Sequence, residues 1–225
     1  LILGDMGHIY GNGYSILIGD DVTCNGLYLY GASKDGTLTV KPGRIEVRSG
    51  RFNRIIGYIR SKTSFDANDN EAVITVDGTA VVSSIVAGSA SGEIKNGNVS
   101  VNIKGGTVAK LIGGCQGYTT VKAPYSGNTT INISGGSVTD VYGAGSGRNT
   151  AIPTYQGKLD IHVTGEMSQI SMVPVRRICG KRRRAVSGKY RGIRGNSWEI
   201  YMSAGNRRRF GGERRSNEEN GTPAS

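Results

Sequence analysis

The sequence predicts an all-β protein that folds as a parallel β-helix, or β-solenoid, with coils of about 27–30 residues. Glycines recur at one point of a repeated unit, 30 residues apart, at Gly105, Gly135, Gly165 and Gly195. Short runs before the first three of these glycines alternate apolar and polar residues, which is typical of a half-buried strand. No ten-residue run has the 3.6-residue period of a helix. A unit with two strands and no helix buries its apolar face only by stacking coil on coil.

The clearest copies of the unit lie in the middle of the chain. Their first strands are predicted at Val101-Asn102-Ile103, Ile131-Asn132-Ile133 and Ile161-His162-Val163. Stacking would place Val101, Ile131 and Ile161 above one another, about 4.8 Å apart. Second strands are expected at residues 108–113 and 138–143, with shortened copies at 167–170 and 198–200. Residues 146–156 would project from a corner of the coil.

The pattern divides the chain into four parts. Residues 1–43 are expected to form irregular early coils, with short strands at 15–18 and 27–30, and residues 44–173 form the regular coils. Residues 174–205 are expected to form degraded, strongly basic coils, and residues 206–225 a disordered tail. A β-propeller is the competing repeat fold, but its blades need four strands in about 40–45 residues.

Copies such as TTINISGGSVTDVYGAG and VSVNIKGGTVAKLIGG resemble the Gly-rich β-solenoid repeats of large bacterial surface and adhesin-like proteins, of the parallel β-helix type. The resemblance covers roughly residues 44–165. It implies an extracellular or cell-surface location and a structural or adhesive role. It brings no catalytic residues and no cofactor to this sequence.

Composition agrees with a turn-rich solenoid. The chain has 36 Gly and only 5 Pro, and hydrophobic residues make up 36%, which is low for a globular core. No run of 18 apolar residues occurs, so no membrane-spanning helix is predicted. The chain begins at Leu1 with no initiator Met and no signal peptide, as expected for a fragment that starts within a repeat array.

Charge is concentrated near the C-terminus. Residues 1–173 hold 14 Lys and Arg against 13 Asp and Glu, whereas residues 174–225 hold 14 against 4. Arginine clusters match phosphate and carboxylate groups, so polyanion binding is one hypothesis for this region. A solvated tail and a reading-frame error in the underlying gene are the alternatives. The candidate residues are Arg182, Arg183, Arg184, Arg207, Arg208 and Arg209.

One acidic segment carries a weak calcium-loop pattern. Asp66, Asn68 and Asn70 place oxygen ligands at alternate positions, and Asp77 falls at the twelfth position of the pattern. Calcium loops need glycine at the sixth position for a sharp turn, and this sequence has Glu71 there. A polar loop between coils is the competing interpretation.

Asn102, Asn132 and His162 occupy the same position of successive repeats. Their side chains are expected to form a ladder on one outer face, either as plain solvated surface or as a glycan-binding strip. The three cysteines, Cys24, Cys115 and Cys179, have no metal-site spacing and are expected to be small buried residues.

No P-loop, nucleophile elbow or zinc-protease motif is present. We therefore expect a non-enzymatic structural or adhesive segment of a secreted repeat protein. Its partners would be glycans or host and cell-wall components. The alternatives are a β-helical carbohydrate-active or carbohydrate-binding protein, with a lyase or glycosidase as the enzymatic form, and a polyanion binder acting through its basic C-terminal region.

Overall fold

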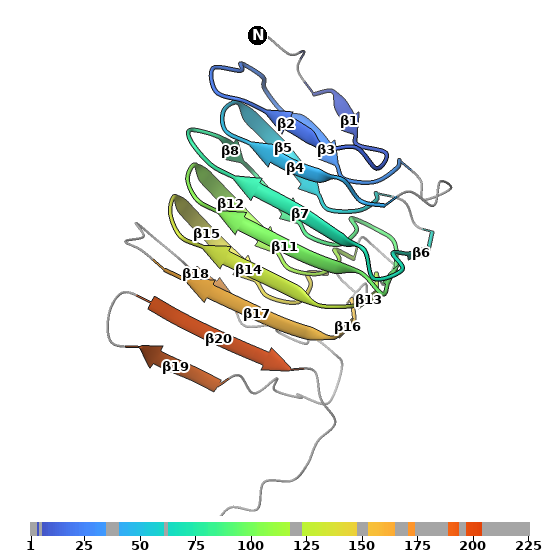
Figure 1. Ribbon diagram of the computed structural model, residues 1–225, viewed down its shortest axis with the longest axis vertical. Coiled ribbons are helices and arrows are strands. Elements are labelled where there is room, and N and C mark those ends of the chain that lie inside the picture. The colour runs from blue at the N-terminus through green and yellow to red at the C-terminus, as the bar shows by residue number, and fades with distance from the viewer. Residues whose placement is uncertain are drawn as a thin grey trace, which may run out of the picture.

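The strands stack into a parallel β-solenoid, as the repeat predicts (Figure 1). The computed structural model describes residues 4, 6–34, 41–60, 63–117, 123–147, 153–164, 171–173, 189–193 and 197–203, and these contain strands but no helix. Three parallel sheets run along the stack, which we call the front, rear and side sheets. Figure 1 looks onto the front sheet, with the N-terminal coils at the top.

The front sheet follows the predicted pairing coil by coil. Val101, Ile131 and Ile161 are aligned in register and buried, and Ile74 and Ile45 extend this column toward the N-terminus. Strict two-residue alternation sends these side chains inward and their neighbours outward. The sheet comprises β2 (Ile16–Ile18), β4 (Arg44–Val47), β7 (Glu71–Val76), β11 (Asn98–Ile103), β14 (Thr129–Ile133), β17 (Lys158–Val163), β20 (Ser197–Ser203) and β19 (Lys189–Ile193).

The rear sheet is less regular. Leu27 pairs with Phe52 but Tyr28 pairs with Arg54, so β5 holds one more residue than β3 at this point. This is a β-bulge, in which two consecutive residues of one strand lie opposite a single residue of the neighbouring strand. The sheet comprises β1 (His8–Tyr10), β3 (Leu27–Tyr30), β5 (Arg51–Ile56), β8 (Val81–Val82), β9 (Ile85–Val86), β12 (Thr107–Ile112), β15 (Ser137–Tyr142) and β18 (Ser171–Val173).

The side sheet was not predicted. Its strands are two residues long: β6 (Phe65–Asp66), β10 (Ile94–Lys95), β13 (Tyr125–Ser126) and β16 (Tyr155–Gln156). Phe65, Ile94 and Tyr125 are buried, and the Tyr125 and Tyr155 rings stack with centroids 5.2 Å apart. The end of the expected projecting segment 146–156 therefore belongs to the solenoid wall.

The corner between the side and front sheets requires glycine. Gly127 and Gly157 have φ of +136° and +138°, and a Cβ on either would lie within 1.8 Å of the carbonyl oxygen of the glycine one coil earlier. Residues with a side chain avoid this backbone conformation and cannot approach so closely. Glycine at this corner lets successive coils stack without a gap.

The C-terminal strands correct the expectation of a further coil. Strand β20 pairs with β17 in the antiparallel sense, and β19 pairs with β20 in the same way. Ile200 lies opposite Ile161, whereas a continuing coil would have brought it beside residue 170. The two strands form a hairpin on the last front strand, seen at the bottom of Figure 1.

The last rear strand also differs from the prediction. Strand β18 spans Ser171–Val173 and pairs with Asp140–Tyr142, so it lies after the expected segment 167–170. Residues 165–170, 174–188 and 204–225 lie outside the described part of the chain, and with them the predicted tail.

Candidate functional site

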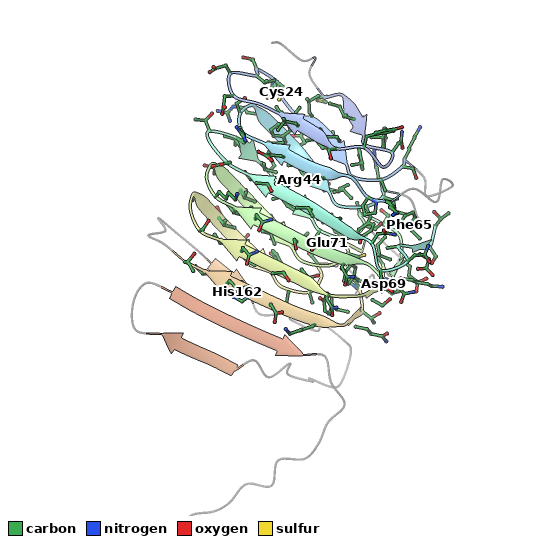
Figure 2. The ribbon with its side chains drawn as sticks, in the orientation of Figure 1. Cys24, Arg44, Phe65, Asp69, Glu71 and His162 are labelled. Atoms are coloured by element: carbon green, nitrogen blue, oxygen red, sulfur yellow. The ribbon has the colours of Figure 1, made fainter. Side chains whose placement is uncertain are left out.

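The outer face of the front sheet carries the predicted polar ladder. Asn102 pairs in register with Asn132, and Asn132 with His162. The Asn132 Nδ2 donates a hydrogen bond to Asn102 Oδ1 over 2.9 Å. All three residues are partly exposed. Figure 2 shows His162 on this face together with Arg44 and Glu71.

A second polar column runs beside the ladder. Ser100, Thr130 and Asp160 are in register on consecutive strands, and Ser100 Oγ donates to a carboxylate oxygen of Glu71. We call the face formed by Ser100, Asn102, Thr130, Asn132 and His162 the amide strip. Its hydroxyl and amide groups both donate and accept hydrogen bonds.

Asparagines also hold the front corner together. Asn98 Oδ1 accepts a hydrogen bond from Asn128 N over 3.1 Å, and Asn128 Oδ1 accepts one from Lys158 N over 3.0 Å. Each side chain thereby adds one hydrogen bond between its own coil and the backbone of the next coil. These two asparagines act in stability, so they are not part of the amide strip.

Three described cations on or next to the front strands have carboxylate partners. Arg48 lies 2.8 Å from a Glu46 oxygen and 3.8 Å from an Asp20 oxygen, Arg44 lies 3.5 Å from Glu46, and Lys158 lies 2.8 Å from Asp160. The hydrogen bond and charge of Glu46 raise the pKa of Arg48 further. The charges of Arg44, Arg48 and Lys158 are therefore largely compensated by neighbouring carboxylates.

The first two rear strands hold an aromatic array that the sequence analysis missed, formed by His8, Tyr10, Tyr28 and Tyr30, of which Tyr30 is fully buried. The His8 and Tyr28 rings stack with centroids 4.8 Å apart, and the Tyr10 and Tyr30 rings stack at 4.6 Å. His8 Nδ1 lies 3.1 Å from the Tyr30 hydroxyl. Burial raises the pKa of Tyr30, and the charges of Arg60 and Arg54 act in the opposite direction. The signal was the aromatic alternation at residues 8–10 and 28–30, but its 20-residue spacing does not match the 30-residue repeat.

The candidate calcium ligands are not brought together. Asp66, Asn68 and Asn70 lie at the corner before β7, and Asp77 follows its far end. Six extended residues separate the two ends by roughly 20 Å. Asp66 Oδ1 instead accepts hydrogen bonds from Asn68 N and Asn96 Nδ2. No group of three His, Cys, Asp or Glu residues that could hold a metal ion occurs among the described residues.

Other candidate residues take no part in a described site. Cys24 and Cys115 are buried, as predicted, and burial raises the pKa of Cys115 to about 12. Cys179 and the arginines at 182–184 and 207–209 lie outside the described residues. A shallow depression of about 450 Å³ on the side sheet is lined by Lys95, Ser126 and Gln156, among others.

The acidic positions of the rear sheet bear on the enzymatic alternative. Asp140 pairs with Lys110 one coil before and with Ser171 one coil after. Glycoside hydrolysis commonly uses two carboxyl groups that flank the scissile bond. The in-register neighbours of Asp140 supply no second one.

No protein-family model, no curated protein and no solved structure matches this chain. The resemblance to bacterial surface repeats therefore rests on the repeat and on the solenoid itself. The described residues form no helix of the length and hydrophobicity needed to cross a bilayer.

Proposed function

We propose that this chain is a non-enzymatic structural and adhesive segment of a secreted or cell-surface repeat protein, and that the amide strip is its glycan-binding face. One observation carries the proposal: hydroxyl and amide side chains recur at the same two positions of β11 and β14, with His162 continuing the ladder on β17. Stacked strands repeat them about every 4.8 Å.

The chemistry of the strip favours a neutral sugar. Sugar hydroxyls both donate and accept hydrogen bonds, as do Ser, Thr and Asn side chains. Arg44, Arg48 and Lys158 already have carboxylate partners, so an anionic ligand would compete with existing ion pairs there. Weak contacts on each coil would add up along an extended ligand.

Binding without covalent chemistry also agrees with the rear sheet. Asp140 has a lysine and a serine as its in-register neighbours. A glycosidase would commonly need a second carboxylate close to it.

The test is a panel of immobilised neutral glycans probed with the full chain. Thr130→Arg places a bulky charge in the middle of the strip without touching the buried side chains. We expect it to lower retention by about tenfold, the effect of losing one or two hydrogen bonds. Thr139→Arg adds the same charge on exposed rear-sheet surface and is the matched control.

Two outcomes would contradict the proposal. Failure of the unaltered chain to bind any neutral glycan would remove the adhesive role. Equal loss in both variants would show that binding does not depend on the amide strip.

A further inference from the structure

The outer face of the rear sheet carries one hydrogen-bonding residue per strand in five successive coils. His8 pairs with Tyr28, and Tyr28 with Arg54. The pairing of Ile55 with Ile85 and of Ile85 with Leu111 places Ser84 between Arg54 and Lys110. We call His8, Tyr28, Arg54, Ser84 and Lys110 the donor row. Its members follow the solenoid axis about every 4.8 Å, and the row ends where Lys110 pairs with Asp140.

The cations of this row have no carboxylate partner among the described residues. The ion pairs in that part of the chain involve Arg44, Arg48, Lys95 and Lys158, and none involves Arg54, Arg60 or Lys110. Although Asp140 lies beside Lys110 in register, the Lys110 Nζ sits over the Tyr142 ring, 5.6 Å from its centroid. Positive charge on the rear sheet is thus available to an anion.

Ser84 is an independent indication of a missing ligand. Ser84 is only 9% exposed, and its Oγ has no hydrogen-bond partner among the described residues. Buried hydroxyl groups are nearly always hydrogen-bonded, because leaving one unpaired is costly. This hydroxyl lies in the middle of the row, between the two cations.

The aromatic array indicates which polyanion fits. The rings of Tyr28 and Tyr30 are stacked against those of His8 and Tyr10, at 4.8 and 4.6 Å. Single-stranded nucleic acids bind by stacking bases on open aromatic faces. Here the facing ring surfaces cover one another, so that mode of binding is disfavoured and hydrogen bonding by hydroxyl groups remains.

We propose that the donor row binds an extended acidic polysaccharide. Its carboxylates would pair with Arg54 and Lys110, while its hydroxyl groups would bond Tyr28 and Ser84. The two cations lie two strands apart, roughly 10 Å. In an extended chain of uronic acids, alternate sugars turn the same side toward a surface. The proposal concerns a different face from the amide strip and stands without it.

The experiment measures binding of a galacturonic acid hexamer to the full chain by calorimetry. The double variant Arg54→Gln/Lys110→Gln removes both cations of the row. We expect it to weaken binding by at least about tenfold, since charge-assisted hydrogen bonds are the strong ones. The double variant Arg44→Gln/Lys158→Gln makes the same charge change on the front sheet and should stay within about twofold, because this binding does not use the front sheet. All variants retain the basic residues 174–225, so their contribution is common to every measurement.

Ser84→Ala separates a binding role from a structural one. Removing an unpaired buried hydroxyl should leave the melting temperature unchanged or higher, while affinity for the hexamer falls severalfold. Acetylation of Lys110 should slow when the hexamer is bound, whereas that of Lys158 should not.

Four results would overturn the proposal. These are no binding of the hexamer by the unaltered chain, equal weakening in the two double variants, unchanged affinity in Ser84→Ala, and tighter binding of an oligodeoxythymidine than of the hexamer. Equal weakening in the two double variants would assign binding to net charge. Tighter binding of the oligodeoxythymidine would favour a nucleic acid as the ligand. Thr130→Arg should leave hexamer binding intact, so failure here is distinguishable from failure of the amide strip.

Discussion

The front and rear sheets enclose one core yet present opposite chemistry to solvent. On the front sheet, Arg44 and Lys158 have carboxylate partners, and Asn132 bonds Asn102 in the coil before it. On the rear sheet, Arg54 and Lys110 have no carboxylate partner among the described residues. Among the same residues, Ser84 Oγ has no hydrogen-bond partner. Inward positions are constrained by packing, whereas outward positions are free to diverge from face to face.

The difference has a geometric origin. Strands β11, β14 and β17 alternate strictly, so a polar residue recurs opposite a polar residue in the next coil. The rear sheet contains the extra residue of β5, which shifts the pairing between Leu27 and Tyr28. Bulges change the direction of side chains and are frequent near functional sites. A solenoid can therefore carry two unlike surfaces on one repeat.

The largest expected effect tests whether the two sheets contribute equally to the core. Ile131 faces inward from the front sheet and Leu111 from the rear, and both are fully buried. Replacing either by alanine should lower the free energy of unfolding by about 2–5 kcal/mol, since each leaves a cavity. Urea denaturation measures this. A loss near zero at only one of the two sites would show that the sheets do not share one core.

A second prediction concerns ionisation inside the solenoid. Burial raises the pKa of Cys115 from 9.0 to about 12, so its thiol stays protonated in the folded chain after it ionises in the unfolded one. Stability from this group is complete below pH 9 and is lost as pH rises toward 12, at about 1.4 kcal/mol per unit. Cys115→Ala should give a shallower decline in unfolding free energy between these pH values. A slope identical to that of the unaltered chain would contradict the burial of this thiol.

The aromatic array sharpens the comparison on the rear side. Tyr10→Leu keeps an apolar side chain but loses the stacking with Tyr30. We expect a loss of up to about 1.5 kcal/mol, measured by chemical denaturation. Tyr14→Leu, at a highly exposed tyrosine outside the array, is the control and should change little. Equal effects would mean that stacking does not stabilise the first coils.

The corner asparagines provide the matching test on the front side. Asn128→Ala removes the acceptor for Lys158 N and should cost about 1 kcal/mol. Asn128→Asp retains an oxygen acceptor and should restore most of the loss. If aspartate and alanine behave alike, the hydrogen bond seen at this corner contributes nothing.

The smallest effect is expected for the paired surface charges. Lys158 is well exposed, so replacing it by glutamine should change stability by about 0.5 kcal/mol or less, and less still at high salt. Thermal melts at two salt concentrations check this. A loss well above that of Asn128→Ala would show that ion pairs, rather than amide ladders, hold the front face together.

Much of the front sheet was predictable because one physical signal defines it. The alternation in Ile131-Asn132-Ile133 and its neighbours, repeated every 30 residues, predicted both the buried column and the alignment of Asn102, Asn132 and His162. The side sheet could not be found in this way, since strands of two residues are too short to show alternation. The aromatic array was missed because its coils differ in length from the later ones.

Linear spacing also misled where an extended strand intervened. Asp77 follows Asp66 at the interval of a calcium loop, but β7 carries it to the opposite edge of the front sheet. The alternation at residues 198–200 suited a strand without showing its direction, because parallel and antiparallel strands share the same two-residue period.

By itself, the sequence determined the all-β class, the coil repeat and the inward columns of the front sheet. These depend on local periodicity and on backbone sterics, which a single chain displays directly. Only the tertiary structure decided the third sheet, the direction of the C-terminal hairpin, the partners of each charge and the row from His8 to Lys110. Those features depend on which coils lie side by side, and coil lengths that vary along the chain set that alignment.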